Sequence, residues 1–209
     1  MDWQAVVLLG AYHGINPGMG WLFAVALGMQ QGSARGVWRA LPPIALGHLI
    51  AVGVVVLTAA LVQAALAPGA MRLFVAVTLM TLGTYRLWRH RHPRFGGMQV
   101  GPRDLTVWSC LMASAHGAGF MVLPFVMPTS GTLSAAGHEH MHDVAGTSAT
   151  SVVGIAVAIH TLAYLSVMAL VAWVVYRKLG LRVLRKAWFN MDWLWACALL
   201  VTGVVVLLR

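Results

Sequence analysis

Six long apolar segments constrain what this chain of 209 residues can fold into. A membrane-spanning helix needs about 20 mostly apolar residues, and six segments are suited to that role: about residues 4–28, 40–64, 70–88, 105–127, 150–176 and 189–208. Only 9% of the residues are charged, against roughly 25% in a soluble domain. We therefore predict an all-α polytopic integral membrane protein with six transmembrane helices, in which residues 1–209 form a single transmembrane domain.

Basic residues fall almost entirely on one side of the predicted bundle. Twelve of the 14 Lys and Arg residues lie in or beside the first, third and fifth connections: Arg35, Arg39, Arg86, Arg89, Arg91, Arg94, Arg103, Arg177, Lys178, Arg182, Arg185 and Lys186. Lys and Arg concentrate in cytoplasmic loops, so we predict that both termini lie outside the cytoplasm. The same asymmetry accounts for the net charge of +9 without a nucleic-acid partner. We expect a bacterial inner (cytoplasmic) membrane, with the lipid bilayer as partner; a homo-oligomer remains open.

The two halves of the chain resemble each other at a few positions. The matching pairs are His13 and His116, His48 and His160, and Gly83 and Gly203. Each half, about residues 1–95 and 104–209, holds three predicted helices. Because three is odd, a duplication places the copies upside down to one another. This inverted repeat is common among transporters, whose sites lie near the bilayer midplane between the repeats.

Four histidines fall inside the predicted helices. His13 and His116 lie near the middle of their segments, and His48 and His160 lie at mirrored depths. A single buried histidine can simply donate a hydrogen bond between helices. Ionisable residues at this depth more often mark a pathway or site, and neutral imidazole is the commonest metal ligand. We predict a shared site that binds a transition metal, relays protons, or does both.

The segment 13–20 interrupts the first predicted helix. Pro17 removes a backbone donor, and three glycines near it weaken the helix. Carbonyl groups without a hydrogen-bond partner are tolerated inside the membrane only where they are buried in protein or line a cavity. Because such a cavity could hold a substrate, this break is a candidate substrate path. Asn16 and the soft thioether of Met19 are candidates to tune selectivity. The alternative interpretation is a kink that permits close helix packing.

The connection at about 128–149 is predicted to lie outside the cytoplasm and contains a cluster of candidate metal ligands. These auxiliary ligands are His138, Glu139, His140, His142 and Asp143. Imidazole, carboxylate and thioether groups in one short segment can capture a metal ion. The alternative interpretation is a hydrophilic loop without a ligand.

Residues 9–57 carry a family resemblance. His13, the segment through Gly20, the Gly-rich basic stretch from Leu27 to Gly36, and Gly47 with His48 resemble the first half of NicO-type nickel/cobalt transporters, within the wider LysE/DsbD-like membrane transporter group. The resemblance implies that His13 and His48 belong to the metal path. Asn16 stands where that family usually has an acid, and Met19 where it usually has a second histidine.

Together these observations predict a secondary transporter of a transition metal cation rather than an enzyme. His13, His48, His116 and His160 are the predicted metal ligands, and no phosphate-binding motif for ATP is present. The sequence does not distinguish nickel, cobalt, copper and zinc. Two alternatives remain: a membrane-embedded metal- or haem-binding oxidoreductase, because facing histidines can hold a haem, and an exporter of a small organic or oxyanion solute.

Overall fold

The computed structural model describes residues 2–63, 68–88, 100–126, 142–179 and 191–208, which form helices and contain no strand. The elements are α1 (Trp3–Ile15), η1 (Pro17–Met19), α2 (Trp21–Gln30), α3 (Ala34–Gln63), α4 (Pro68–Trp88), α5 (Pro102–Ala115), α6 (Ala118–Val126), α7 (His142–Val174), η2 (Val175–Leu179) and α9 (Met191–Leu208). The prediction of an all-α protein is confirmed for this part of the chain.

Two of the described helices are long and apolar enough to cross a membrane. They are Ala34–Val62 within α3 and Ser151–Lys178 within α7 and η2. α5 and α6 pass the same test as one pair, bent by 58° at the break between them, and would supply a third span. α2 and Trp193–Leu208 of α9 are apolar but shorter. These lengths support a membrane protein, whereas six complete spans stay a prediction.

The outer surface of the described helices carries many large apolar side chains. Leu8, Leu61, Leu162 and Val201, on four different helices, are each more than 60% exposed. In water such a surface would drive association, whereas lipid tails are as apolar as leucine. The exposed side chains therefore fit a surface in contact with lipid.

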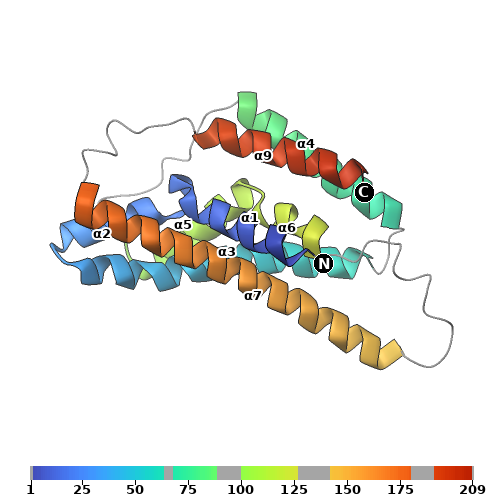
Figure 1. Cartoon of the computed structure of the whole chain (residues 1–209), viewed down its shortest axis with the longest axis horizontal. Helices are drawn as coiled ribbons and strands as arrows, with labels where there is room; N and C mark the ends of the chain where they lie inside the picture. The colour runs from blue at the N-terminus through green and yellow to red at the C-terminus, as the bar shows by residue number, and fades with distance from the viewer. Residues whose placement is uncertain (1, 64–67, 89–99, 127–141, 180–190, 209) are drawn as a thin grey trace.

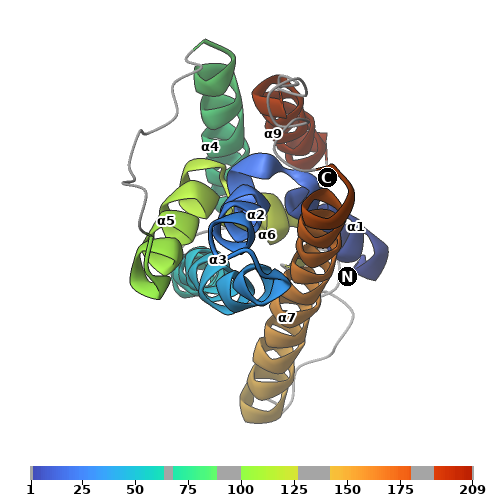
Figure 2. The ribbon, with the colours of Figure 1, turned by 90° about the vertical axis from the view of Figure 1, so that its left-hand side faces the viewer.

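The helices pack in three main pairs: α1 on α7, α3 on α5, and α4 on α9. α1 and α7 run in the same direction, and α4 runs opposite to α9 (Figure 1). The α4–α9 pair lies on one side of the other helices, as the end-on view also shows (Figure 2). Each pair thus joins a helix from the first half of the chain to one from the second half.

Glycines permit these close pairings. A methyl group added at Gly10 of α1 would overlap the carbonyl oxygen of His160 on α7, and one added at Gly47 of α3 would overlap that of Thr106 on α5. Gly83 and Gly203 each face the partner helix within the α4–α9 pair. Small residues let helix backbones approach closely where lipid supplies no hydrophobic drive between helices.

Two helices break, the first of them where the sequence predicts. α1 ends at Ile15, because Asn16 precedes a proline and adopts an extended conformation with ψ 120°. α5 ends beside Gly117, whose φ of +70° is the left-handed conformation typical of the residue after a helix. The first break begins three residues after the buried His13, and the second directly follows the buried His116. Both breaks therefore lie next to candidate site residues.

The span predicted at about 150–176 agrees with the candidate membrane span Ser151–Lys178, but the helix that contains it begins earlier. α7 begins at His142 rather than near residue 150, so the last eight residues of the connection predicted at about 128–149 belong to its first turns. The sequence of residues 142–149 is polar and contains glycine, so apolar length alone placed the helix start too late.

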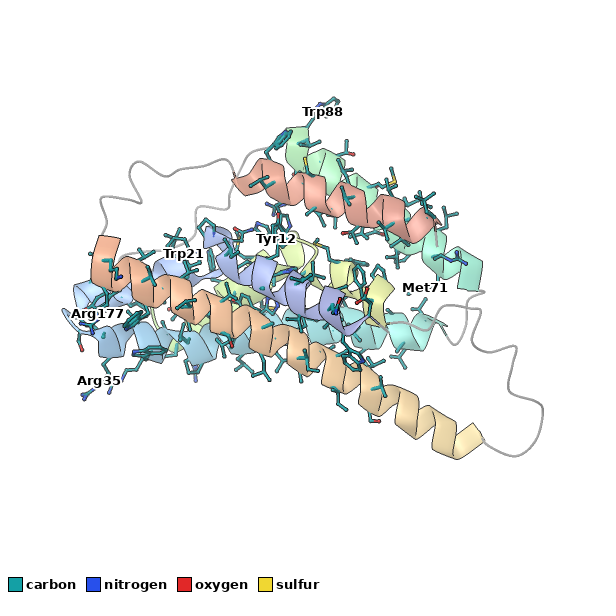
Figure 3. The ribbon with its side chains drawn as sticks, viewed as in Figure 1. Tyr12, Trp21, Arg35, Met71, Trp88 and Arg177 are labelled. Atoms are coloured by element: carbon teal, nitrogen blue, oxygen red, sulfur yellow. The ribbon has the colours of Figure 1, made fainter. Side chains whose placement is uncertain are left out.

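In the side-chain view, Arg35 and Arg177 lie at the same end of the molecule, while Met71 lies toward the other end (Figure 3).

Candidate metal site

Three histidine side chains from α1, α3 and α7 meet in the core. The ring centroid of His13 lies 5.7 Å from that of His48 and 5.1 Å from that of His160. His48 and His160 are stacked, with centroids 5.6 Å apart. All three side chains are fully buried. We call His13, His48 and His160 the histidine cluster.

Most ring nitrogens of the histidine cluster lack hydrogen-bond partners. His13 Nδ1 lies 2.7 Å from the carbonyl oxygen of Leu9, and His160 Nδ1 lies 3.3 Å from that of Val6. A carbonyl oxygen only accepts, so these Nδ1 atoms carry the proton and their Nε2 atoms carry the lone pair. His13 Nε2, His160 Nε2 and both nitrogens of His48 have no partner among the described residues.

Aromatic side chains surround the histidine cluster. Tyr164 is stacked on His48 with centroids 4.0 Å apart, and its hydroxyl donates to the carbonyl oxygen of Met19 at 2.7 Å. Trp195 of α9 lies perpendicular to His13 at 4.6 Å and is itself stacked on Tyr12 at 5.1 Å. Sequence reasoning missed both roles. Tyr164 follows His160 by four residues, a spacing that puts both on one helix face and could have indicated it.

His116 contacts a different set of groups. Its Nδ1 lies 2.7 Å from the carbonyl oxygen of Met112, and its Nε2 lies 3.2 Å from Nη1 of Arg86. Arg86 also donates from Nε and Nη2 to the carbonyl oxygen of Ala115, at 3.3 and 3.0 Å. The indole of Trp195 donates to the carbonyl oxygen of His116 at 2.7 Å. Three of the four predicted ligands therefore come together, and Trp195 links them to the fourth.

The predicted tuning residues form the break between α1 and α2. Pro17 begins η1, and Asn16 Oδ1 accepts from the backbone nitrogen of Gly18 at 2.9 Å, which caps that turn. The Met19 side chain is buried in the apolar core. Trp21 spans the break, donating from its indole to the carbonyl oxygen of Ile15 at 2.9 Å. Neighbouring side chains thus satisfy the backbone groups that the break frees.

The auxiliary ligands cannot be placed beside this site. His138, Glu139 and His140 lie outside the described residues, and of His142 and Asp143 only the helical backbone is described. Among the described residues, no group of three or more His, Cys, Asp or Glu side chains converges closely enough to hold a metal ion as it stands. In the histidine cluster the ring centroids lie 5.1 to 5.7 Å apart.

Comparison with known proteins gives no match: no protein-family model, no curated protein and no solved structure is significantly similar to the chain.

Proposed function

We propose that this protein is an integral membrane secondary transporter of a transition metal cation, and that the histidine cluster is its cation site. One observation carries the proposal: three fully buried imidazoles in mutual contact leave four nitrogens without partners among the described residues. A buried polar group without a partner costs about 1–3 kcal/mol, and such groups in native structures often mark an ion or a functional site. One nitrogen of each ring carries a lone pair, and a cation that accepts these three lone pairs removes most of that cost.

The spacing of the rings suits a metal ion. An ion about 2.0–2.1 Å from one nitrogen of each of three rings, in tetrahedral geometry, sets the ring centroids about 5 Å apart. The three observed separations are 5.1, 5.6 and 5.7 Å. Binding then needs the rings to turn so that their free nitrogens converge, with little change in the spacing of the helices. Rings this close leave no room for the much wider haem macrocycle unless the helices separate.

The chemistry of the histidine cluster favours a borderline transition metal. Imidazole suits nickel, copper, zinc and iron, whereas magnesium and calcium prefer oxygen ligands. His13 and His160 hold their Nδ1 protons on backbone carbonyl oxygens, an arrangement typical of metal-binding histidines. The resemblance of residues 9–57 to NicO-type transporters also favours nickel or cobalt. Three ligands leave a fourth position open, through which a transported ion can arrive and leave.

The packing supports an inverted-repeat transporter with six spans. α1 packs on α7, α3 packs on α5, and α4 packs on α9. If the two halves of the chain are exchanged by a two-fold rotation, the α1–α7 pair becomes the α3–α5 pair. The same rotation maps the α4–α9 pair onto itself. Each half also contains one broken helix. With no ATP motif, we propose a proton gradient as the energy source, because imidazoles must be neutral to bind metal and binding is therefore linked to protons.

Binding and flux measurements on matched variants test the function. We define the loop-substituted protein as the chain with His138→Ala, His140→Ala and His142→Ala, without an affinity tag, so that outer ligands do not contribute. Its His13→Gln, His48→Gln and His160→Gln variants should each bind Ni²⁺ and Zn²⁺ at least about tenfold more weakly in equilibrium dialysis. They should also lose metal flux in proteoliposomes.

Thr161→Ala is the matched control, because Thr161 adjoins His160 but its hydroxyl bonds only along α7, to Val157. It should retain binding and flux. Equal metal binding by the histidine variants and the control contradicts the proposal. A Soret absorbance band in protein purified without chelator would instead favour the haem-binding alternative.

A further inference from the structure

His13 and His116 have the same local structure, but the surroundings of their Nε2 atoms differ. Each lies at or near the end of the first piece of a broken helix, and each holds its Nδ1 proton on the carbonyl oxygen four residues earlier, at 2.7 Å. Both Nε2 atoms therefore carry a lone pair. His13 Nε2 has no partner among the described residues, whereas His116 Nε2 meets Arg86 Nη1 at 3.2 Å.

Arg86 brings a permanent positive charge to this second position. A guanidinium is always protonated and has donors only, and Arg86 directs three of its nitrogens at His116 Nε2 and the carbonyl oxygen of Ala115. That carbonyl lies at the C-terminal end of α5, where the helix dipole favours a cation. The guanidinium thus occupies a position whose groups would suit a metal cation.

The repeat-related position on α9 lacks such a charge. Arg86 follows Gly83 by three residues on α4, and Val206 follows Gly203 by three residues on α9. The two glycines face each other's helices in the same pair, so Val206 corresponds to Arg86. The α4 helix of the first half therefore places the Arg86 cation beside His116 of the second half. The corresponding residue of α9, Val206, carries no charge.

One further oxygen atom lies in the neighbourhood of His116. A Cβ atom built on Gly18 would lie 3.2 Å from Asn16 Oδ1 and 3.5 Å from His116 Nε2. Asn16 Oδ1 and His116 Nε2 therefore both lie near Gly18, which itself carries no side chain. The Ala115 carbonyl oxygen, His116 Nε2 and the Asn16 amide oxygen are atom types that bind divalent metals.

We propose that Arg86 is a tethered cation that fills the position beside His116 Nε2, the repeat-related counterpart of the position beside His13 Nε2, so that the chain binds one metal ion instead of two. This inference rests on the proposed function. Arg86 excludes a metal ion both by engaging the His116 lone pair and by like-charge repulsion. It is thus a residue that sets metal stoichiometry, and it keeps His116 out of the cation site in this conformation.

Counting bound metal in Arg86 variants tests the inference. By equilibrium dialysis with Ni²⁺ and with Zn²⁺, the loop-substituted protein should bind one ion per chain. Arg86→Gln should bind a second, weaker ion, and Arg86→Gln with His116→Ala should return to one. Arg86→Lys, which keeps a cation, should also stay at one. Size-exclusion chromatography and thermal unfolding confirm that each variant is folded.

The outcomes separate the two proposals. A starting protein that binds no metal overturns the proposed function, and this inference with it. A folded Arg86→Gln variant that still binds one ion, or a second ion that survives His116→Ala, overturns only the inference. His116→Ala with Arg86 intact provides a second test if Arg86→Gln does not fold: it should keep one ion at unchanged affinity, and a tenfold weaker affinity would make His116 a ligand of the first ion and overturn the inference.

Discussion

The indole of Trp195 lies perpendicular to the imidazole of His13, with ring centroids 4.6 Å apart and an interplanar angle of 88°. The same indole donates to the carbonyl oxygen of His116. The Trp195 side chain of α9 therefore contacts the histidine cluster and also donates a hydrogen bond at the break between α5 and α6. Because Trp195 is almost fully buried, its loss should affect both features at once.

We expect Trp195→Phe to destabilise the folded protein by about 1 kcal/mol, because the ring is kept but the carbonyl oxygen of His116 loses its donor. Trp195→Ala should cost about 3–5 kcal/mol through the cavity that it leaves. Thermal unfolding in detergent measures both. Trp88→Phe is the control, since Trp88 is 90% exposed and its replacement should change stability by less than about 0.5 kcal/mol. Equal effects of the two Phe variants would contradict the role of the indole.

Gly10→Ala should separate α1 from α7. The added methyl group would overlap the backbone carbonyl of His160, which cannot move aside as a side chain can, so we expect a loss of about 1–3 kcal/mol. Metal binding should weaken as well, because the same contact sets the distance between His13 and His160. Gly53→Ala is matched to it: nothing lies within 4 Å of the added atom, so stability should be unchanged or slightly higher. The idea fails if the two variants unfold at the same temperature.

Removing the imidazoles of the outer segment should weaken apparent affinity without abolishing transport. In the loop-substituted protein, His138, His140 and His142 are replaced, whereas the proposed cation site in the histidine cluster is left intact. We expect the concentration for half-maximal flux to rise severalfold while the maximal rate is nearly retained. His13→Ala should instead remove flux at every concentration. A loop-substituted protein that is inactive at saturating metal would make these histidines part of the central site.

Both termini should lie outside the cytoplasm. The basic residues of the first, third and fifth connections predict this orientation, and Arg35 and Arg177 do lie at one end of the molecule (Figure 3). Reporter fusions after Arg209 should be active only with a periplasmic reporter, and fusions in the connection at residues 180–190 only with a cytoplasmic one. A cytoplasmic C-terminus would exclude the proposed orientation and the inverted arrangement that depends on it.

Local features of the fold could be predicted from the sequence because they depend on neighbouring residues. Apolar length predicts helices along the chain, and Pro17 predicts the break after α1 through its backbone restriction. The burial of His13, His48, His116 and His160 also follows from their places within apolar segments, and all four are fully buried. The start of α7 was missed because polar residues extend that helix beyond its apolar part.

The composition of the histidine cluster depended on the tertiary structure. The positions of the four histidines within their apolar segments predict their depth in the membrane. These positions do not predict which face of each helix contacts which neighbouring helix, because lipid and protein interiors are equally apolar. The close contact at Gly10 brings His13 to His160. Arg86 and Trp195 reach His116 from distant segments of the chain. Those contacts engage the lone pair and the carbonyl group of His116.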